Sequence, residues 1–143
     1  MAAGGSFDFA SVWLFSGLSR SELRSLARKA EARSLAVGTV VCDEGDVGQE
    51  LYVILSGRAE VLRSGRRVAV LGPGDHFGEL ALLDRLPRSA SVRATSNLEL
   101  LVIAQADFNS LLKDSPALTR KLLAATVARL RAADTKAASA ALH

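Results

Sequence analysis

The residues whose types and spacing could do chemistry are concentrated in one segment, residues 74–92, which interrupts a series of apolar stretches. Gly78 permits close approach of another backbone or an unusual turn. Residues 79–83 suit one or two turns of helix, which Pro87 must end because the residue before a proline avoids the α conformation. The free amides at the start of such a helix can bind an anion.

Three polar side chains in this segment suit a sugar phosphate. Arg88 supplies a planar, permanently charged fork that matches a phosphate, and Ser89 adds a hydroxyl beside it. The Glu79 carboxylate would repel a phosphate, but it can accept hydrogen bonds from a ribose-like diol, as the acidic residue of dinucleotide-binding folds does. An arginine for phosphate and a carboxylate for sugar together indicate a nucleotide ligand.

The elements that must position these groups are mainly short strands. Between residues 35 and 104, apolar and β-branched stretches alternate with turn signals, and the turn glycines at 45, 57, 65 and 74 follow one another at the intervals typical of a β-sandwich or barrel. The expected strands lie at residues 38–42, 51–55, 59–62, 68–71, 90–94 and 98–103. This pattern predicts a small antiparallel β-roll, which is jelly-roll-like.

Helices are expected on both sides of this roll, which makes the fold class α+β. Residues 1–34 are predicted to be helical, with Ser19 and Glu22 at capping-box spacing. A short helix is expected from Asp107 to Lys113. Ser115 and Pro116 then suit the N-cap and first position of a last helix that runs to about Thr135.

Composition limits the function classes. The chain has 143 residues, 49% of them hydrophobic and 23% charged, which predicts one ordered domain over residues 1–143. One cysteine and two histidines argue against a disulfide framework or a metal centre, and no HExxH, P-loop or nucleophile-elbow motif is present.

No apolar run approaches the about 20 residues of a membrane span, and no signal peptide is recognisable, so we expect a cytoplasmic protein without membrane contact. The net charge of +3 is interspersed, which does not indicate a polyanion partner.

The segment also resembles a known family. The runs at residues 77–83 and 87–92 closely resemble the phosphate-binding cassette of cyclic nucleotide-binding domains, which occur in catabolite activator proteins, in regulatory subunits of cyclic-AMP-dependent kinase and in cyclic-nucleotide-gated channels. The flanking stretches at residues 14–23, 44–46 and 51–57 are similar to the family as well, so the resemblance covers nearly the whole chain.

This resemblance implies a role for each matching residue. Glu79 would bind the ribose 2′-hydroxyl, Gly78 would let the sugar approach, and Arg88 would pair with the cyclic phosphate. The rest of the phosphate cradle would come from the segment around them, namely Leu80, the amides of Ala81 and Ala90, and Ser89. The base would lie against Val61, Ala69 and Leu71, and the last helix would cover it with Arg129, Leu130 and Ala133.

The resemblance implies a regulatory sensor that is not an enzyme and needs no cofactor. Its ligand would be cAMP, with cGMP as the alternative, and ligand binding would reposition the last helix. Each residue also has a plainer interpretation: Glu79 could complement a helix dipole, Ser89 could bond its own backbone, and Val61, Ala69 and Leu71 could be core.

Other arrangements of the protein stay open. A cupin-type enzyme shares a small β-roll but needs a cluster of metal ligands. The chain could be the sensor part of a transcription regulator or an ion channel, although residues 136–143 are too few for a recognition helix, so we expect no DNA binding by this chain alone. We expect a monomer, with a homodimer through the last helix as the alternative, because the apolar positions of that helix lack a sustained heptad. The sequence does not identify a downstream effector.

Overall fold

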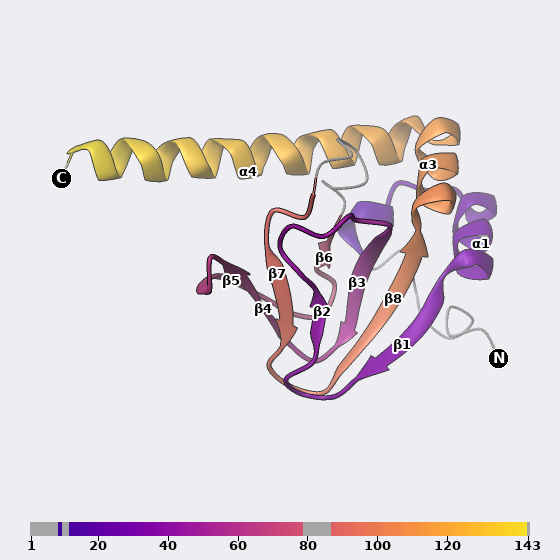
Figure 1. The fold of residues 1–143 in the computed structure, drawn as a ribbon. Coiled ribbons are helices and arrows are strands. Elements are labelled where there is room, and N and C mark those ends of the chain that lie inside the picture. Colours follow the sequence, from indigo (N-terminus) through magenta and orange to yellow (C-terminus); the bar gives the residue numbers. More distant parts are fainter. Residues whose placement is uncertain (1–8, 10–11, 79–86, 143) are drawn as a thin grey trace.

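Two antiparallel sheets of four strands each make up the body of the molecule (Figure 1). The computed structural model describes residues 9, 12–78 and 87–142, apart from the side chains of residue 129 and residues 133–142. The described strands are β1 (Glu31–Leu35), β2 (Val40–Cys42), β3 (Glu50–Ser56), β4 (Ala59–Arg63), β5 (Arg66–Leu71), β6 (His76–Phe77), β7 (Ser91–Ala94) and β8 (Leu98–Ala104). They pair in the orders β1-β8-β3-β6 and β2-β7-β4-β5. The predicted jelly-roll-like β-roll within an α+β fold is therefore confirmed.

Helices flank this roll in the sequence and pack on one side of it. A 3₁₀ turn, η3 (Trp13–Phe15), and α1 (Arg20–Lys29) precede the strands, and α3 (Gln105–Asp114) and α4 (Pro116–Leu142) follow them. The predicted capping box starts α1: the Ser19 hydroxyl accepts from the Glu22 amide, and the Glu22 carboxylate accepts from the Ser19 amide. Ser115 accepts from the Leu118 amide at the start of α4, as an N-cap residue does.

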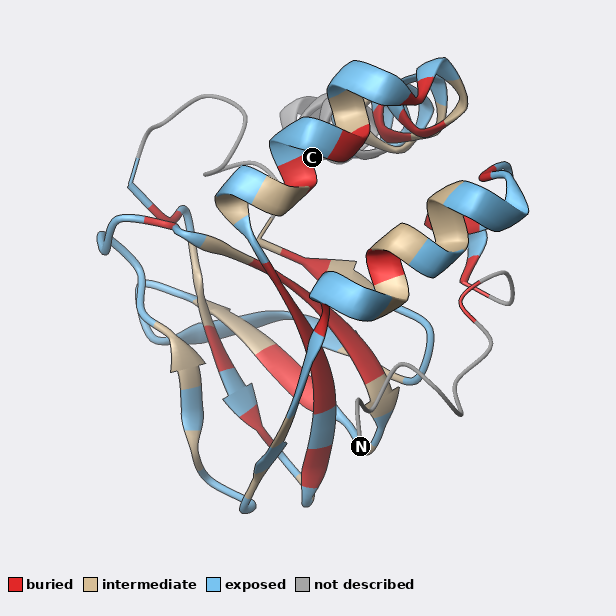
Figure 2. Ribbon diagram, turned by 90° about the vertical axis from the view of Figure 1, so that its right-hand side faces the viewer, coloured by how far each residue is buried: buried red, intermediate tan, exposed pale blue. Residues whose placement is uncertain are grey.

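Most residues of β3 and β8, the central strands of the first sheet, are buried, and because successive side chains of a strand point to opposite sides, both faces of these strands are covered. One face packs on the helices, and the other packs on the second sheet (Figure 2). The helix-facing residues include Leu51, Val53, Leu101 and Ile103, which pack with Phe15, Leu26, Phe108 and Leu118. The residues between the sheets include Tyr52, Ile54, Leu100 and Val102, which pack with Ala59, Val92 and Ala94.

The strand registers bring the predicted site segments together. Tyr52 on β3 lies opposite Phe77 on β6, which places the start of residues 77–92 at the edge of the first sheet. On the second sheet, Val61 of β4 lies between Ala69 of β5 and Val92 of β7. The candidate functional site therefore lies between the β3–β6 edge of the first sheet and strands β4, β5 and β7 of the second sheet.

The structure differs from the sequence-based expectation in three places. The roll begins at Glu31, so the boundary expected between residues 34 and 35 falls inside β1. Residues 74–92 were expected to interrupt the strands, but His76 in this segment belongs to the two-residue strand β6 and pairs with Val53. The last helix extends to Leu142 rather than to about Thr135. The short helix predicted at residues 79–83 lies outside the described residues.

Candidate functional site

A cavity of about 380 Å³ lies between the second sheet and the segments on either side of residues 79–86. Its size is within the range of small-molecule sites, which are mostly apolar with a few polar groups. The predicted base-side residues Val61, Ala69 and Leu71 line it. The predicted phosphate-side residues that the structure describes line it as well, namely Gly78, Arg88, Ser89 and Ala90.

Arg88 is the charged group at the centre of this arrangement. Only 7% of the residue is exposed. Its Nη1 donates to the Gly78 carbonyl at 3.1 Å, and its Nη2 donates to the Glu50 carbonyl at 2.9 Å. The guanidinium carbon also lies 5.5 Å from the centre of the Tyr52 ring. The electron-rich face of an aromatic ring attracts a cation at this distance. These contacts fix the side chain in one place.

The charge of Arg88 is not neutralised by its described surroundings. Its two hydrogen-bond acceptors are neutral carbonyls, and within the described residues no carboxylate forms an ion pair with it. An arginine has five N–H donors, so two carbonyls leave up to three for a ligand. A buried charge is costly unless it is paired, and the site is therefore suited to an anion.

Gly78 makes this position of Arg88 sterically accessible. Its φ of +94° belongs to the left-handed region that favours glycine. A Cβ added at residue 78 would lie 2.5 Å from Arg88 Nη1 and 2.9 Å from the Glu50 carbonyl oxygen. The missing side chain thus leaves room for the guanidinium between two backbone carbonyls.

The structure adds residues to the site that the sequence did not single out. Tyr52 stacks on Phe77 with ring centroids 4.9 Å apart, and Phe77 lines the cavity. The Arg63 Nε donates to the Ser89 carbonyl at 3.3 Å, so the end of β4 is tied to the second half of the cassette. The apolar stretch at residues 51–55 predicted a strand, but it did not show that the Tyr52 ring would lie against the guanidinium of Arg88.

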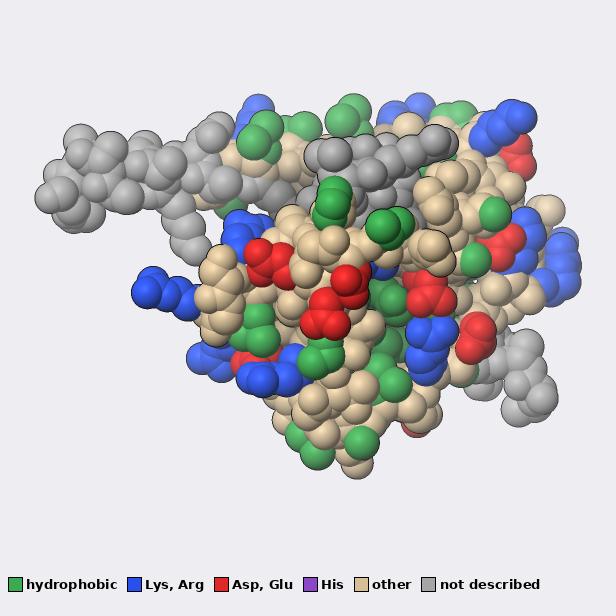
Figure 3. Space-filling model, viewed as in Figure 1, with side chains coloured by type: hydrophobic (Ala, Val, Ile, Leu, Met, Phe, Trp, Pro, Cys, Tyr) green, Lys and Arg blue, Asp and Glu red, His purple; other side chains and the backbone are tan. Residues whose placement is uncertain are grey.

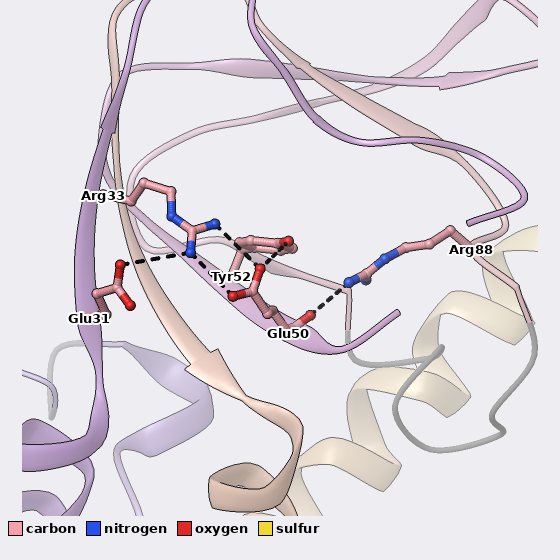
Figure 4. A network of polar contacts seen from close by, with 5 residues as sticks. All are labelled: Glu31, Arg33, Glu50, Tyr52 and Arg88. Atoms are coloured by element: carbon pink, nitrogen blue, oxygen red, sulfur yellow. Dashed lines mark hydrogen bonds and ion pairs between the residues drawn. The ribbon is translucent and has the colours of Figure 1, made fainter. Parts of the chain in front are cut away.

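Behind Arg88, a network of polar contacts crosses the inner face of the first sheet (Figure 4). Arg33 donates to both carboxylate oxygens of Glu50, at 3.3 and 3.2 Å, and the Tyr52 hydroxyl donates to Glu50 Oε1 at 2.9 Å. Burial would raise the pKa of Glu50, but the hydrogen bonds from Arg33 and Tyr52 leave it below its usual value. Burial, together with the neighbouring Glu50 carboxylate, raises the pKa of Tyr52 to about 12.

Cys42, in the strand predicted at residues 38–42, also lines the cavity. It is half-buried, and burial raises the pKa of its thiol, an effect that the nearby Arg88 charge partly opposes. The thiol therefore stays protonated at neutral pH.

Other predicted site residues are not brought to the cavity or cannot be placed. Glu79, Leu80 and Ala81 lie outside the described residues, as do the side chains of Arg129 and Ala133. Leu130 is described and is 62% exposed. No described residue of α4 lines the cavity, and the helix extends beyond the roll (Figure 1).

Charge over the rest of the surface is mixed. Figure 3 shows Lys and Arg side chains spread over one face with Asp and Glu between them. Arg93, on the strand predicted at residues 90–94, is exposed and forms an ion pair with Glu60 across β7 and β4. Among the described residues, no three His, Cys, Asp or Glu side chains gather as a metal site would require, and no described helix has the length and hydropathy to cross a bilayer.

Comparison with known proteins agrees with this geometry. Residues 32–115 match the family model of the cyclic nucleotide-binding domain. The Cyclic AMP receptor protein of Thermus thermophilus is 36% identical over 126 residues, which cover 85% of this chain and 58% of that protein. A cyclic nucleotide-gated potassium channel of Rhizobium etli is 37% identical over 107 residues, which cover 75% of this chain and 30% of the channel.

A solved structure shows the same fold. It is the regulatory domain of Toxoplasma gondii PKA in a co-crystal with cAMP, with a TM-score of 0.70 and 36% identity over 78% of this chain and 43% of that one. The chain thus spans between about a third and three-fifths of the length of these relatives.

Proposed function

Because the chain belongs to the cyclic nucleotide-binding domain family, we propose that it is a regulatory sensor domain that binds a cyclic nucleotide in the cavity beside Arg88. The observation that carries this proposal is the burial of Arg88 between two carbonyls, with donors left for an anion. The relatives are receptors, kinase regulatory subunits and channels, which supports a regulatory role rather than catalysis.

In this proposal the cavity divides into a phosphate side and a base side. Arg88 pairs with the cyclic phosphate, assisted by the Ser89 hydroxyl and the Ala90 amide. The base lies against the apolar residues of β4 and β5 that line the cavity, Val61, Ala69 and Leu71. Glu79 accepts a hydrogen bond from the ribose 2′-hydroxyl, and the backbone at Leu80 and Ala81 completes the cradle.

We favour cAMP over cGMP as the ligand. A relative that spans most of this chain is named as a cyclic AMP receptor, and the Toxoplasma regulatory domain was crystallised with cAMP. The apolar lining of the base side offers few hydrogen-bonding groups to a guanine base. The Ser89 hydroxyl is the group that could form a hydrogen bond with guanine. Isothermal titration with cAMP and cGMP decides between the two, and equal or tighter binding of cGMP contradicts the preference.

We further propose that ligand binding repositions the C-terminal part of α4. Leu118 and Leu122 anchor the start of the helix in the core, whereas Leu123 and Leu130 are exposed. A helix that closes over the base would cover some of this apolar surface, with Arg129, Leu130 and Ala133 nearest the ligand. Such a ligand-dependent contact is what a population shift between two states requires.

We also propose that the protein is monomeric, since Thr126 and Ala133 occupy positions where a stable coiled coil needs larger side chains. Light scattering at micromolar concentration tests this. A mass of twice 15.1 kDa contradicts it and favours a homodimer through α4.

The experiment that tests the proposed function is a titration of wild type and Arg88→Ala with cAMP. A hydrogen bond to a charged group contributes about 1.5–3 kcal/mol, so the variant should bind at least about tenfold more weakly. Thermal unfolding without ligand controls for damage to the fold. Wild-type protein that binds neither cAMP nor cGMP would refute the proposal, and equal affinity in the variant would remove Arg88 from the site.

The role of Glu79 is tested with 2′-deoxy cAMP. Wild type should bind this analogue more weakly than cAMP, whereas Glu79→Ala should discriminate far less between the two ligands. The coupling energy of this cycle isolates the contact from general damage. A coupling energy of zero would mean that Glu79 does not contact the sugar.

A further inference from the structure

The network behind Arg88 joins two arginines through a single acidic residue. The backbone carbonyl of Glu50 accepts a hydrogen bond from Arg88 Nη2 at 2.9 Å. Its carboxylate points the other way and accepts two hydrogen bonds from Arg33 and one from Tyr52 (Figure 4). Glu50 therefore contacts Arg88 through its backbone carbonyl, whereas its carboxylate is bound by Arg33 and Tyr52.

Arg33 reaches this carboxylate from a strand that is not adjacent to β3. It lies on β1, opposite Leu100 of β8, and β8 separates β1 from β3. The contact between Arg33 and Glu50 crosses β8 on the face of the first sheet that packs on the second sheet. On the same face, Arg33 Nη2 lies 3.8 Å from Glu31 Oε1. A carboxylate that was free to rotate would be drawn to the nearest unpaired cation, since opposite charges attract more strongly in a partly buried site than in water.

Among the described residues, Arg88 is a cation with no ion pair, and it contacts the backbone carbonyl of the same residue, Glu50. It has only neutral carbonyl acceptors there, and its charge already acts on Glu50, because it is one of the groups that lower the pKa of that carboxyl. Glu50 is ionised at neutral pH, since its pKa is lowered. A Glu50 carboxylate on Arg88 would compete with any anionic ligand for the same donors.

We propose that Arg33 is a positioning residue for the ligand site, which, together with Tyr52, holds the Glu50 carboxylate away from Arg88 and so keeps Arg88 available for an anionic ligand. The inference rests on the proposed function, because it concerns the binding of the phosphate. It also gives a reason for a two-pronged contact at this place: a guanidinium that binds both carboxylate oxygens leaves neither of them pointing toward Arg88.

A structural ion pair and a positioning contact make different predictions for the two partners. If the pair only stabilised the fold, removal of either partner would disturb the site in the same direction. If Arg33 restrains a competitor, removal of Arg33 weakens ligand binding, whereas removal of the Glu50 charge does not. Loss of the competitor must also cancel the effect of losing Arg33, and this reversal is a result that a merely structural role does not produce.

The experiment is a titration with cAMP of wild type, Arg33→Ala, Glu50→Gln and the double variant. Arg33→Ala should bind cAMP about fivefold more weakly, the upper end of the range for an exposed or partly exposed ion pair. Glu50→Gln keeps the backbone carbonyl that holds Arg88, so it should bind as tightly as wild type or more tightly. The double variant should return to within about twofold of Glu50→Gln. Arg33→Lys, which keeps a cation without the fork, should lie between wild type and Arg33→Ala.

Arg93→Ala is the matched control, because it removes another cross-strand ion pair, the one with Glu60, from residues that do not line the cavity. It should lower the thermal midpoint and leave the affinity unchanged. Unchanged affinity in Arg33→Ala, or a double variant as weak as Arg33→Ala, overturns the inference alone. Failure of wild type to bind either cyclic nucleotide overturns the proposed function and the inference with it.

Discussion

Gly78→Ala adds one methyl group next to Arg88 and should lower both the stability of the protein and its affinity for cAMP. At residue 78 the new Cβ would lie 2.5 Å from Arg88 Nη1, 2.9 Å from the Glu50 carbonyl oxygen and 3.3 Å from Tyr52 Cδ2. Arg88 is the end of a flexible side chain and can move, but the carbonyl of β3 cannot do so without breaking the sheet. The variant should therefore expel the guanidinium from between its two carbonyl acceptors.

The magnitude has two parts. A non-glycine residue in the left-handed region costs about 1–2 kcal/mol. Loss of a hydrogen bond to the charged Arg88 adds about 1.5–3 kcal/mol. The free energy of unfolding should thus fall by about 3 kcal/mol or more, and the affinity for cAMP should fall at least about tenfold, because the donors are no longer held toward the phosphate.

Gly74→Ala separates these two parts. Gly74 has a φ of +88°, and a Cβ there would meet no atom within 4 Å, so this variant has the backbone strain without the contact. It should lose about 1–2 kcal/mol of stability and keep its affinity within about twofold. Urea denaturation and calorimetric titration measure the two quantities. Equal affinities in the two variants would refute the argument that Gly78 is required for the position of Arg88.

Three further predictions concern other residues around the cavity. Tyr52→Phe keeps the ring on Phe77 and Arg88 but loses the hydroxyl contact to Glu50, so unfolding in urea should show a loss of about 1 kcal/mol. The affinity for cAMP should fall less than in Arg33→Ala, because both hydrogen bonds from Arg33 still hold the Glu50 carboxylate. The Cys42 thiol has a pKa raised by burial, so its alkylation should be slower at pH 7 than that of a free thiol and should accelerate as the pH rises. Bound cAMP should slow the alkylation further because Cys42 lines the cavity, and fast labelling at pH 7 contradicts this prediction. Truncation after Ala125 keeps Leu118 and Leu122 and should leave the roll folded, while stopped-flow kinetics should show faster cAMP dissociation if α4 acts as a lid.

Features that depend on local spacing were predictable from the sequence. The capping box needs only Ser19 and Glu22 three residues apart, and the structure has both of its hydrogen bonds. The strands with turn signals at their ends were placed to within a few residues. Gly78, Arg88, Ser89 and Ala90, to which the resemblance to the family's cassette gave roles, line one cavity, and their function as a binding site stays a prediction. Glu79 lies outside the described residues.

Features that depend on sheet order were not predictable. β1 has the sequence Glu-Ala-Arg-Ser-Leu, which lacks β-branched residues, and it becomes a strand because β8 supplies a partner along its whole length. β6 has only two residues and is defined by its pairing with β3. The contact of Arg33 with Glu50 joins residues 17 positions apart across a third strand, so no spacing rule could reveal it.

The last helix shows why an amphipathic pattern does not by itself assign a role. Leu118, Leu122, Leu123 and Leu130 share one half of the helical wheel, yet the first two are buried and the last two are exposed. The difference arises because η3 and α3 cover only the first turns of α4, where Lys121 also donates to the Trp13 carbonyl at 2.9 Å. Beyond those turns, no described residue covers the apolar side chains of Leu123 and Leu130. An apolar surface that begins where the anchoring contacts end allows the later turns to move while the first turns stay fixed, which a ligand-dependent lid requires.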